Sequence, residues 1–290
     1  MKLSHESKKR LAIGGGAIAL ILVLMGSVTT SHFKQWNNET GSTIMEWGAL
    51  DDPGIDYAAK STVLSKASFS ADEIRSLDLD VESGSVSVKL VDGDAVVVVE
   101  KGRLAKGVKA KAAAFKGLVK VEDQTLKVCG AKKSDKRACD RTVLIEIPRA
   151  LASELAAVHA AVDSGDLSLE HLACKELDLN LGSGDFSYWG VVSDTLDAQV
   201  GSGDAEFTLD AAPATKMDTV VGSGDVYVEI PHDTGFSAEI TLGSGDFDSD
   251  FLEDEVDGLE TPSASFKNGD GAARYNFAIG SGDMTLNTRS

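Results

Sequence analysis

The second half of the chain alternates apolar and polar residues around a recurring Ser-Gly-Asp tripeptide. Six tripeptides end at aspartates that are 19, 19, 21, 21 and 37 residues apart. These aspartates are Asp166, Asp185, Asp204, Asp225, Asp246 and Asp283. The positions four, six and eight residues before each aspartate are mostly apolar, as are those one and three residues after it. Alternation with period two on both sides of a glycine turn predicts strand, tight turn and strand in every unit.

A repeat of about 20 residues predicts a stacked architecture. One unit cannot bury its apolar side alone, but stacked units pair equivalent strands and share an interior. The unit is also too short to contain a crossover helix. The expected fold class is therefore all-β, a single-stranded parallel β-solenoid with coils about 4.8 Å apart. Roughly five large buried side chains per coil, each worth about 1.5–3 kcal/mol, stabilise a stack but not a lone coil.

The Ser-Gly-Asp corner has a structural interpretation and a functional alternative. Glycine takes positive φ without a clash, and Ser and Asp side chains bond backbone N–H groups that a corner leaves unpaired. We therefore expect the six aspartates to form a row of corner residues along one edge of the stack. The alternative is a calcium ladder made of the same six carboxylates, which needs several oxygens converging from two coils. No catalytic role is expected for them.

The same pattern appears earlier, with Ser85 in the position of the aspartate. The solenoid is therefore predicted over residues 75–290, with regular coils over 151–290. The first part of this range, residues 75–150, is expected to be irregular. Its Lys- and Ala-rich stretch, residues 106–116, is predicted to be a short helix or a loop. The acidic insert before the last coil is expected to be a long loop of one coil or a degenerate extra coil.

The amino-terminal segment predicts a membrane anchor. Residues 1–10 end in three basic residues, and residues 11–30 carry no charge. This length matches a membrane span, and the basic flank predicts a cytoplasmic tail with the rest of the chain across the membrane. A cleaved signal peptide is the alternative. Residues 31–74 are predicted to be a tether.

Charge is distributed unevenly along the chain. The net charge of −18 argues against a nucleic-acid partner. Residues 101–149 contain 14 Lys or Arg and 5 Asp or Glu, whereas residues 150–290 contain 5 and 27. The basic segment could bind anionic envelope polymers or lipid head groups. It could instead lie against the acidic coils and neutralise them, which we favour because opposite charges in one domain attract.

Few residues suggest chemistry. Cys129 and Cys139 flank a turn, ten positions apart, and are predicted to form a disulfide in an exported chain, with Cys174 left as a core residue or a thiol. No zinc site is expected, because no histidine lies at ligand spacing, and no other cofactor is predicted. The histidines, including His159 and His171, are predicted to be surface residues. Trp189 and Tyr227 stand out as outward-facing aromatic residues of the regular coils.

Successive GSGD turns, an early VESGSVSVKLVDGD element, a middle IEIPRA segment and a closing IGSGDMTLNT carry a family resemblance. Over roughly residues 75–290 the chain resembles the putative-adhesin β-solenoid family, bacterial envelope domains of unknown function related to the GIN group and to autotransporter adhesin heads. The resemblance implies a parallel β-solenoid, often tethered to a membrane. It implies no catalytic residues.

Together these features predict a non-enzymatic protein of the bacterial inner membrane, with a single membrane pass and a periplasmic or extracellular carboxy-terminal domain. Its solenoid would present a surface for binding or adhesion, with an envelope protein or a glycan as partner. One alternative is a carbohydrate-active β-helix enzyme, which needs a groove with two converging carboxylates. Another is a sensor or assembly domain in envelope-stress signalling.

Overall fold

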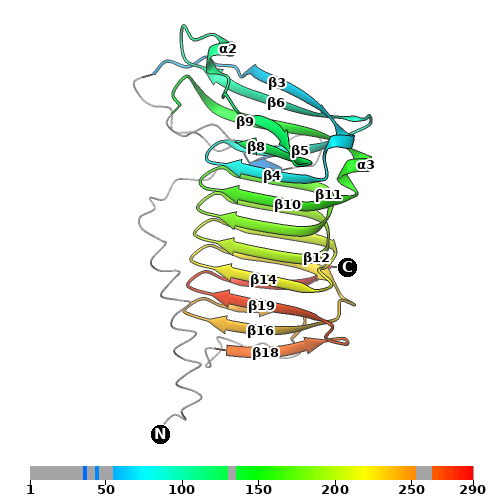
Figure 1. Ribbon diagram of the computed structural model, residues 1–290. Coiled ribbons are helices and arrows are strands. Elements are labelled where there is room, and N and C mark those ends of the chain that lie inside the picture. Colours follow the sequence, from blue (N-terminus) through cyan, green and yellow to red (C-terminus); the bar gives the residue numbers. More distant parts are fainter. Residues whose placement is uncertain (1–34, 38–42, 46–54, 130–134, 253–262, 290) are drawn as a thin grey trace.

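The computed structural model describes residues 35–37, 43–45, 55–129, 135–252 and 263–289, and the three longest of these ranges form an elongated stack of coils (Figure 1). The anchor predicted at residues 11–30 lies outside the described residues. None of the helices in the described ranges has the length and apolar character that a membrane crossing requires.

Strands β3 to β20 form one continuous 18-stranded sheet, whose two largely parallel sides are called sheet 1 and sheet 2 below, so the predicted all-β solenoid is confirmed. A regular coil is exemplified by β14 (Lys216–Val221) and β15 (Val226–Pro231), which are joined by a Ser-Gly-Asp corner. β14 pairs with parallel neighbours in sheet 1, and β15 does so in sheet 2. The long strands β11 (Asp166–Leu181) and β12 (Asp185–Val200) run from sheet 2 into sheet 1 and connect them.

Each sheet follows one side of the stack. In spatial order, the strands of sheet 1 are β8 (Thr125–Cys129), β4 (Ser76–Val81), β10 (Leu155–Val162), the ends of β11 and β12, β14, β19 (Ala273–Ile279), β16 (Phe236–Leu242) and β18 (Ser263–Asn268). Those of sheet 2 are β9 (Ala138–Pro148), β5 (Ser85–Val91), the beginnings of β11 and β12, β13 (Ala205–Ala211), β15, β20 (Met284–Arg289) and β17 (Phe247–Ser249).

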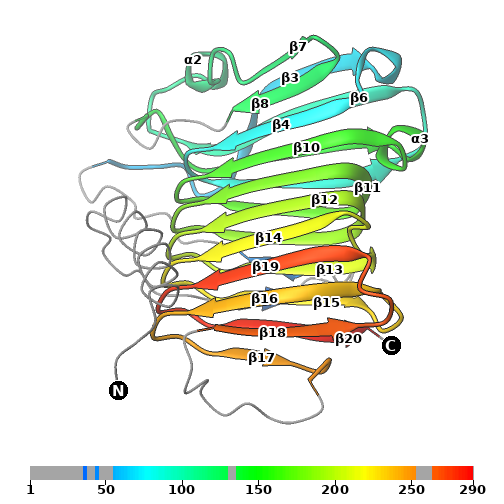
Figure 2. The same cartoon turned by 60° about the horizontal axis from the view of Figure 1, so that its bottom comes forward.

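The order of coils in space departs from the order in sequence at both ends. The last coil, β19 and β20, lies between the β14–β15 coil and the β16–β17 coil. Figures 1 and 2 show β14, β19, β16 and β18 in this succession. Similarly, the β4–β5 coil lies between β8–β9 and β10–β11. The simplest form of the predicted stack, in which consecutive units lie on one another in sequence order, therefore does not hold at the two ends.

Aromatic packing gives a physical reason for the insertion of the last coil. Tyr275 and Phe277 of β19 are completely or almost completely buried. The Tyr275 ring stacks on Phe236 of β16, with centroids 4.6 Å apart, and the Phe277 ring stacks on Phe247 of β17 at 5.6 Å. A terminal coil would expose these large rings on one side, whereas an internal coil buries them against neighbours on both sides.

Antiparallel strands cover both ends of the stack. β18 pairs with β16 in the antiparallel sense, so the predicted insert forms a returning strand rather than a coil. At the other end, β3 (Thr62–Ser70) and β6 (Ala95–Leu104) continue from β9 as antiparallel strands, and β7 (Val119–Glu122) pairs with β8. β3 lies inside the predicted tether, so the domain begins before residue 75. Its single buried residue, Leu64, explains why its sequence pattern is weak.

The remaining elements are short. The Lys- and Ala-rich stretch contains the one-turn helix α2 (Ala110–Ala113). The 3-10 turn η1 (Ala71–Glu73) precedes β4, and α3 (Arg149–Ala152) precedes β10. β1 (Gln35–Asn37) and β2 (Thr43–Met45) form an antiparallel pair within the predicted tether.

Candidate functional site

The six corner aspartates form one row along the edge of the stack, as predicted. Their order in space is Asp166, Asp185, Asp204, Asp225, Asp283 and Asp246. Each of the backbone N–H groups of Asp225, Asp283 and Asp246 donates to the carboxylate of the preceding aspartate in the row, at 3.0 Å. Ser85 occupies the equivalent position next to Asp166. The carboxylates therefore link one coil to the next.

The carboxylate ladder does not gather into a cation site. Within the described ranges, no group of three or more His, Cys, Asp or Glu side chains is arranged to hold a metal ion. One oxygen of each of the Asp204, Asp225 and Asp283 carboxylates accepts a backbone N–H group. These bonds are the ones that the structural interpretation of the corners predicts.

One carboxyl of the ladder gives a pH-dependent prediction. Burial raises the pKa of Asp185 above its ordinary value of 3.8, and the nearby charge of Asp204 raises it further. The folded state therefore binds more protons than the unfolded state above pH 3.8, and stability falls as the pH rises through this window. We expect Asp185→Asn, which keeps an acceptor for the ladder but cannot ionise, to be more stable than the wild type at neutral pH.

Urea unfolding of both proteins at pH 7 and at pH 3 checks this prediction, because the advantage of Asp185→Asn should vanish where the wild-type carboxyl is protonated. An Asp185→Asn variant less stable than the wild type at pH 7 would contradict it.

The corner glycines are needed for close approach of the coils. Positive φ was expected to explain them, but none of the glycines directly before the six aspartates has a positive φ; Gly84, before Ser85, has one of 87°. A Cβ atom on Gly203 would lie 1.8 Å from the carbonyl oxygen of Gly184, and one on Gly224 would lie 1.8 Å from that of Gly203. The glycines therefore form a column in which backbone packs directly on backbone.

The cysteines are thiols. The predicted Cys129–Cys139 disulfide is not formed in the structure. The two residues do not face each other across a hairpin: Cys129 ends β8 and pairs with Asp80 of sheet 1, whereas Cys139 lies in β9 opposite Arg103 of β6. Cys174 points into the core as one of the two predicted outcomes, and its sulfur lies 3.4 Å from the hydroxyl of Tyr188. Burial raises the pKa of the Cys174 thiol to about 11.

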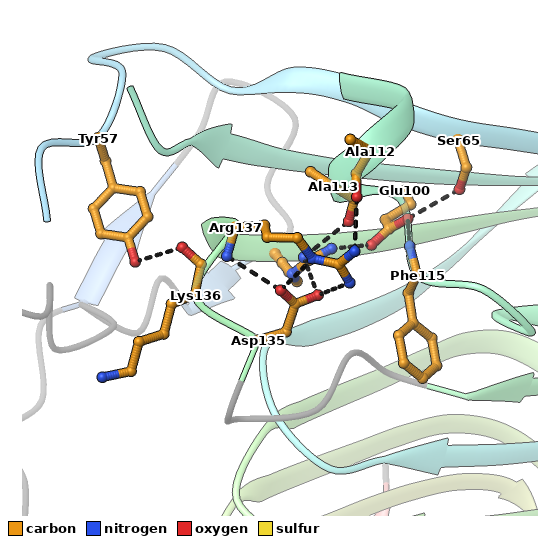
Figure 3. Close-up of polar contacts among 10 residues, drawn as sticks. Tyr57, Ser65, Glu100, Ala112, Ala113, Phe115, Asp135, Lys136 and Arg137 are labelled. Atoms are coloured by element: carbon orange, nitrogen blue, oxygen red, sulfur yellow. Dashed lines mark hydrogen bonds and ion pairs between the residues drawn. The ribbon is translucent and has the colours of Figure 1, made fainter. Parts of the chain in front are cut away.

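The basic segment lies at the end of the stack where α2, β6, β8 and β9 gather, and it contains a buried ion network (Figures 1 and 3). Arg141 donates to Glu100 at 2.5 Å and to Asp135 at 2.8 Å. The other oxygen of Glu100 accepts the hydroxyl of Ser65 and the N–H of Phe115. Arg137 also binds Asp135 and lowers the pKa of its carboxyl. The network fastens α2 and the loop before β9 onto β6.

These contacts correct the expectation that the basic segment neutralises the acidic coils. The ion pairs of Arg103, Lys106 and Arg141 join acidic partners between residues 56 and 140. The segment also lies beyond the first regular coil, at the end of the stack with β6, β8 and β9. Its net positive charge is therefore located at that end. Net charge is thus separated along the long axis of the stack.

The buried network predicts a large loss of stability when one member is removed. Arg141→Met would leave the nearly inaccessible Glu100 carboxylate without its cation, at a cost of about 3 kcal/mol. The matched control is Arg137→Met, because Arg137 belongs to the same network but is half exposed, so its loss should be clearly smaller. Urea unfolding measures both, and equal losses would contradict a special role for the buried pair.

The outer face of sheet 1 is acidic and polar. Asp178, Asp197 and Asp218 follow one another in register across β11, β12 and β14. Lys216 lies beside two of them, 2.6 Å from Asp197 and 2.9 Å from Asp218. His159 precedes them, with its imidazole 3.6 Å from Asp178, and is exposed as predicted. These pairs are solvent-accessible, and such pairs contribute little to stability.

The outer face of sheet 2 differs because it displays aromatic residues. Trp189 of β12 is 39% exposed, and Tyr227 of β15 is half-buried, whereas their neighbours Tyr188 and Val228 point into the core. The outward orientation predicted for both is confirmed. His171, which is exposed as predicted, lies at a register shift of β11, between Glu170 and Leu172, and places its ring 4.3 Å from that of Trp189. The sequence pattern did not predict this contact.

Arg289 at the end of β20 completes the cluster around Trp189. Its guanidinium lies 5.7 Å from the centre of the indole and 2.9 Å from the Asp210 carboxylate. The sequence did not predict this contact, because Arg289 lies near Trp189 only when the last coil is internal to the stack. Asp210 also lines an open groove of about 490 Å³, together with Pro213, Asp233 and Asp270. These residues lie in or next to the loops that follow β13, β15 and β18.

Comparison with known proteins gives a family match and several structural matches. A model of the Toastrack DUF4097 family matches residues 68–287, and no curated protein matches the chain. A putative cell adhesion protein from Clostridium sporogenes ATCC 15579 has 12% sequence identity and a TM-score of 0.42, with coverage of 79% of this chain and 100% of that protein.

Two further solved structures are comparably distant. A putative adhesin from Bacteroides fragilis NCTC 9343 has 11% identity and a TM-score of 0.34, covering 79% of this chain and 98% of that one. A putative lipid binding protein from Parabacteroides distasonis ATCC 8503 has 16% identity and a TM-score of 0.37, covering 80% and 98%. The family match spans most of the chain and confirms the resemblance drawn from the GSGD repeats: the chain belongs to the Toastrack DUF4097 family.

Proposed function

We propose that the chain is a non-enzymatic binding or adhesion module of the bacterial envelope. In this proposal, residues 11–30 anchor it in the inner membrane, and the solenoid lies on the periplasmic or extracellular side. The observation that carries the proposal is the outer face of sheet 2, where Trp189 and Tyr227 lie among polar side chains. Exposed aromatic residues on an otherwise polar surface are typical of recognition sites.

The use of the ionisable groups supports binding rather than catalysis. The ladder carboxylates accept backbone N–H groups, and the Glu100–Arg141 pair fastens the end cap. A sugar-cleaving enzyme needs two carboxylates at a set separation across a cleft. The groove beside Asp210 is open, and that carboxylate is already paired with Arg289. The described residues thus favour a displayed surface over a reaction centre.

Two measurements on the full chain test the proposal. With a carboxy-terminal tag in a bacterial host, the protein should remain with the membrane after carbonate washing, and protease added to spheroplasts should digest its solenoid. In detergent, the purified full chain should bind isolated cell envelopes saturably, and the double variant Trp189→Ala/Tyr227→Ala should lose most of that binding.

Three other results would contradict parts of the proposal. A soluble protein, or one whose solenoid is protected in spheroplasts, would contradict the membrane placement. Envelope binding that the double variant retains in full would contradict the use of the outer face of sheet 2. Release of sugar fragments from the envelopes by the wild type would favour the carbohydrate-active enzyme.

A further inference from the structure

We propose that the outer face of sheet 2 binds an extended, uncharged glycan chain, with Trp189 and Tyr227 as two stacking positions. This inference rests on the proposed function and names the ligand class for the same surface. Sugar rings present C–H groups on their faces, which pack against the electron-rich face of an aromatic ring. Their hydroxyl groups need hydrogen-bonding partners around that ring.

Trp189 has the position and the rigidity that a stacking residue needs. The ring projects from a strand paired on both sides, by β11 and by β13. His171 and Arg289 both contact the indole, and Asp210 holds Arg289 in place. An aromatic ring fixed before binding loses little conformational entropy when a ligand arrives. The exposed 39% of the residue remains available to a ligand.

Tyr227 provides the second position at a defined distance. Trp189 pairs with Thr208 of β13, which pairs with Glu229 of β15, two residues beyond Tyr227. Two strand spacings and a shift of two residues separate the Cα atoms of Trp189 and Tyr227 by about 12 Å. The hydroxyl of Tyr227 donates to Glu229 at 2.7 Å, which fixes its ring. A separation of this size spans neighbouring sugars of a chain and exceeds a single sugar ring.

Polar side chains surround the two aromatic residues in the same register. β13, β15 and β20 lie side by side in sheet 2. Their outward residues continue the rows of Trp189 and Tyr227 with hydroxyl, amide and carboxylate groups. These residues are Glu206, Thr208, Glu229, Thr285 and Asn287, and Ser187 of β12 lies in the row of Tyr227. A flat sheet with such groups suits an extended chain lying across the strands, whereas a single small molecule would need a cavity.

Charge decides between glycan classes. Glu206, Glu229 and Asp210 lie on or beside this face, and residues 150–290 contain 27 acidic and 5 basic residues. A polymer carrying phosphates, sulfates or carboxylates would be repelled. Hexose and N-acetylhexosamine chains carry no charge and use carboxylates and amides as hydrogen-bond partners. The surface therefore favours uncharged glycans over the anionic polymers of the envelope.

Calorimetric titration of the full chain in detergent with cellohexaose, chitohexaose and mannohexaose tests the inference. We expect saturable binding of at least one hexasaccharide, weakened about tenfold or more by Trp189→Ala and by Tyr227→Ala. Because two positions act together, the wild type should bind the hexasaccharide at least about tenfold more tightly than the matching disaccharide. Either variant should lose most of this length dependence. Gln199→Ala is the control, since Gln199 lies on β12 but points outward from sheet 1.

Several outcomes would overturn the inference. They are absence of saturable binding to all three hexasaccharides, equal binding by the wild type and both aromatic variants, and stronger binding of sulfated or phosphorylated chains or of phosphatidylglycerol vesicles. If the wild type still binds cell envelopes through Trp189 and Tyr227 in these cases, the ligand class is wrong and the proposed function stands. If envelope binding also fails, the proposed function falls as well.

Discussion

Gly203→Val should prevent the regular coils from folding. The Cβ atom of any side chain at this position would lie 1.8 Å from the carbonyl oxygen of Gly184, and Gly203 in turn supports Gly224 from the other side. Neither contact can relax by rotating a side chain, because both partners are backbone atoms of stacked corners. Forcing the coils apart would break the carboxylate ladder and open the core. We expect a loss above about 4 kcal/mol, at the extreme of single substitutions.

The measurement is thermal and urea unfolding followed by circular dichroism. Ser202→Ala is the matched control, because Ser202 lies in the same corner but is exposed, and it should change the free energy of unfolding by less than about 0.5 kcal/mol. A Gly203→Val protein as stable as the control would show that the coils do not approach each other at the glycine column.

Removal of residues 273–290 should unfold much more than the end of the chain. In a stack ordered by sequence, this deletion would remove the outermost coil and leave the others paired. In the structure it removes an internal coil, so β14 and β15 lose their partners on one side, and β16 and β17 lose theirs on the other. Six buried side chains disappear with it: Ala273, Tyr275, Phe277, Ile279, Met284 and Leu286.

The expected loss is comparable with the whole stability of a domain. At about 1.5–3 kcal/mol for each large side chain, the deleted residues account for on the order of 10 kcal/mol. Hydrogen exchange should show that β14 to β17 have lost their protection. Removal of residues 288–290 is the control, since it keeps all six buried side chains. Native protection in β14 and β15 after the longer deletion would contradict the internal position of the last coil.

The alternation and the tripeptide were enough to predict the parallel solenoid and the row of aspartates. They report which residues face the core and which form corners, and these depend on short-range geometry. The order of the end coils was not predictable in the same way. β4, β14 and β19 have equivalent patterns, so the pattern does not specify which of them are neighbours; that depends on large rings such as Tyr275 stacking on Phe236.

The candidate site was predicted in part for a similar reason. Trp189 and Tyr227 could be placed outward by counting along their strands, but His171 and Arg289 reach Trp189 only through a register shift and the inserted coil. The spacing of Cys129 and Cys139 suggested a hairpin, because nothing in it reveals that the two strands belong to different sheets. The corners were correctly predicted at the glycines, but the reason for glycine was not. Glycine is required because backbone packs on backbone, and this depends on the distance between coils.

Paired cysteines at the corners test the stacking most directly. In a protein whose native cysteines are replaced by alanine, Ser223→Cys should form a disulfide with Ser281→Cys under mild oxidation. The two corners are adjacent, since the N–H group of Ser281 donates to the carbonyl oxygen of Gly222, and a disulfide requires Cα atoms about 4.4–6.8 Å apart. Ser223→Cys with Ser244→Cys should remain reduced, because these corners lie two coils apart, about 10 Å. Cross-linking of the second pair and not the first would contradict the inserted last coil.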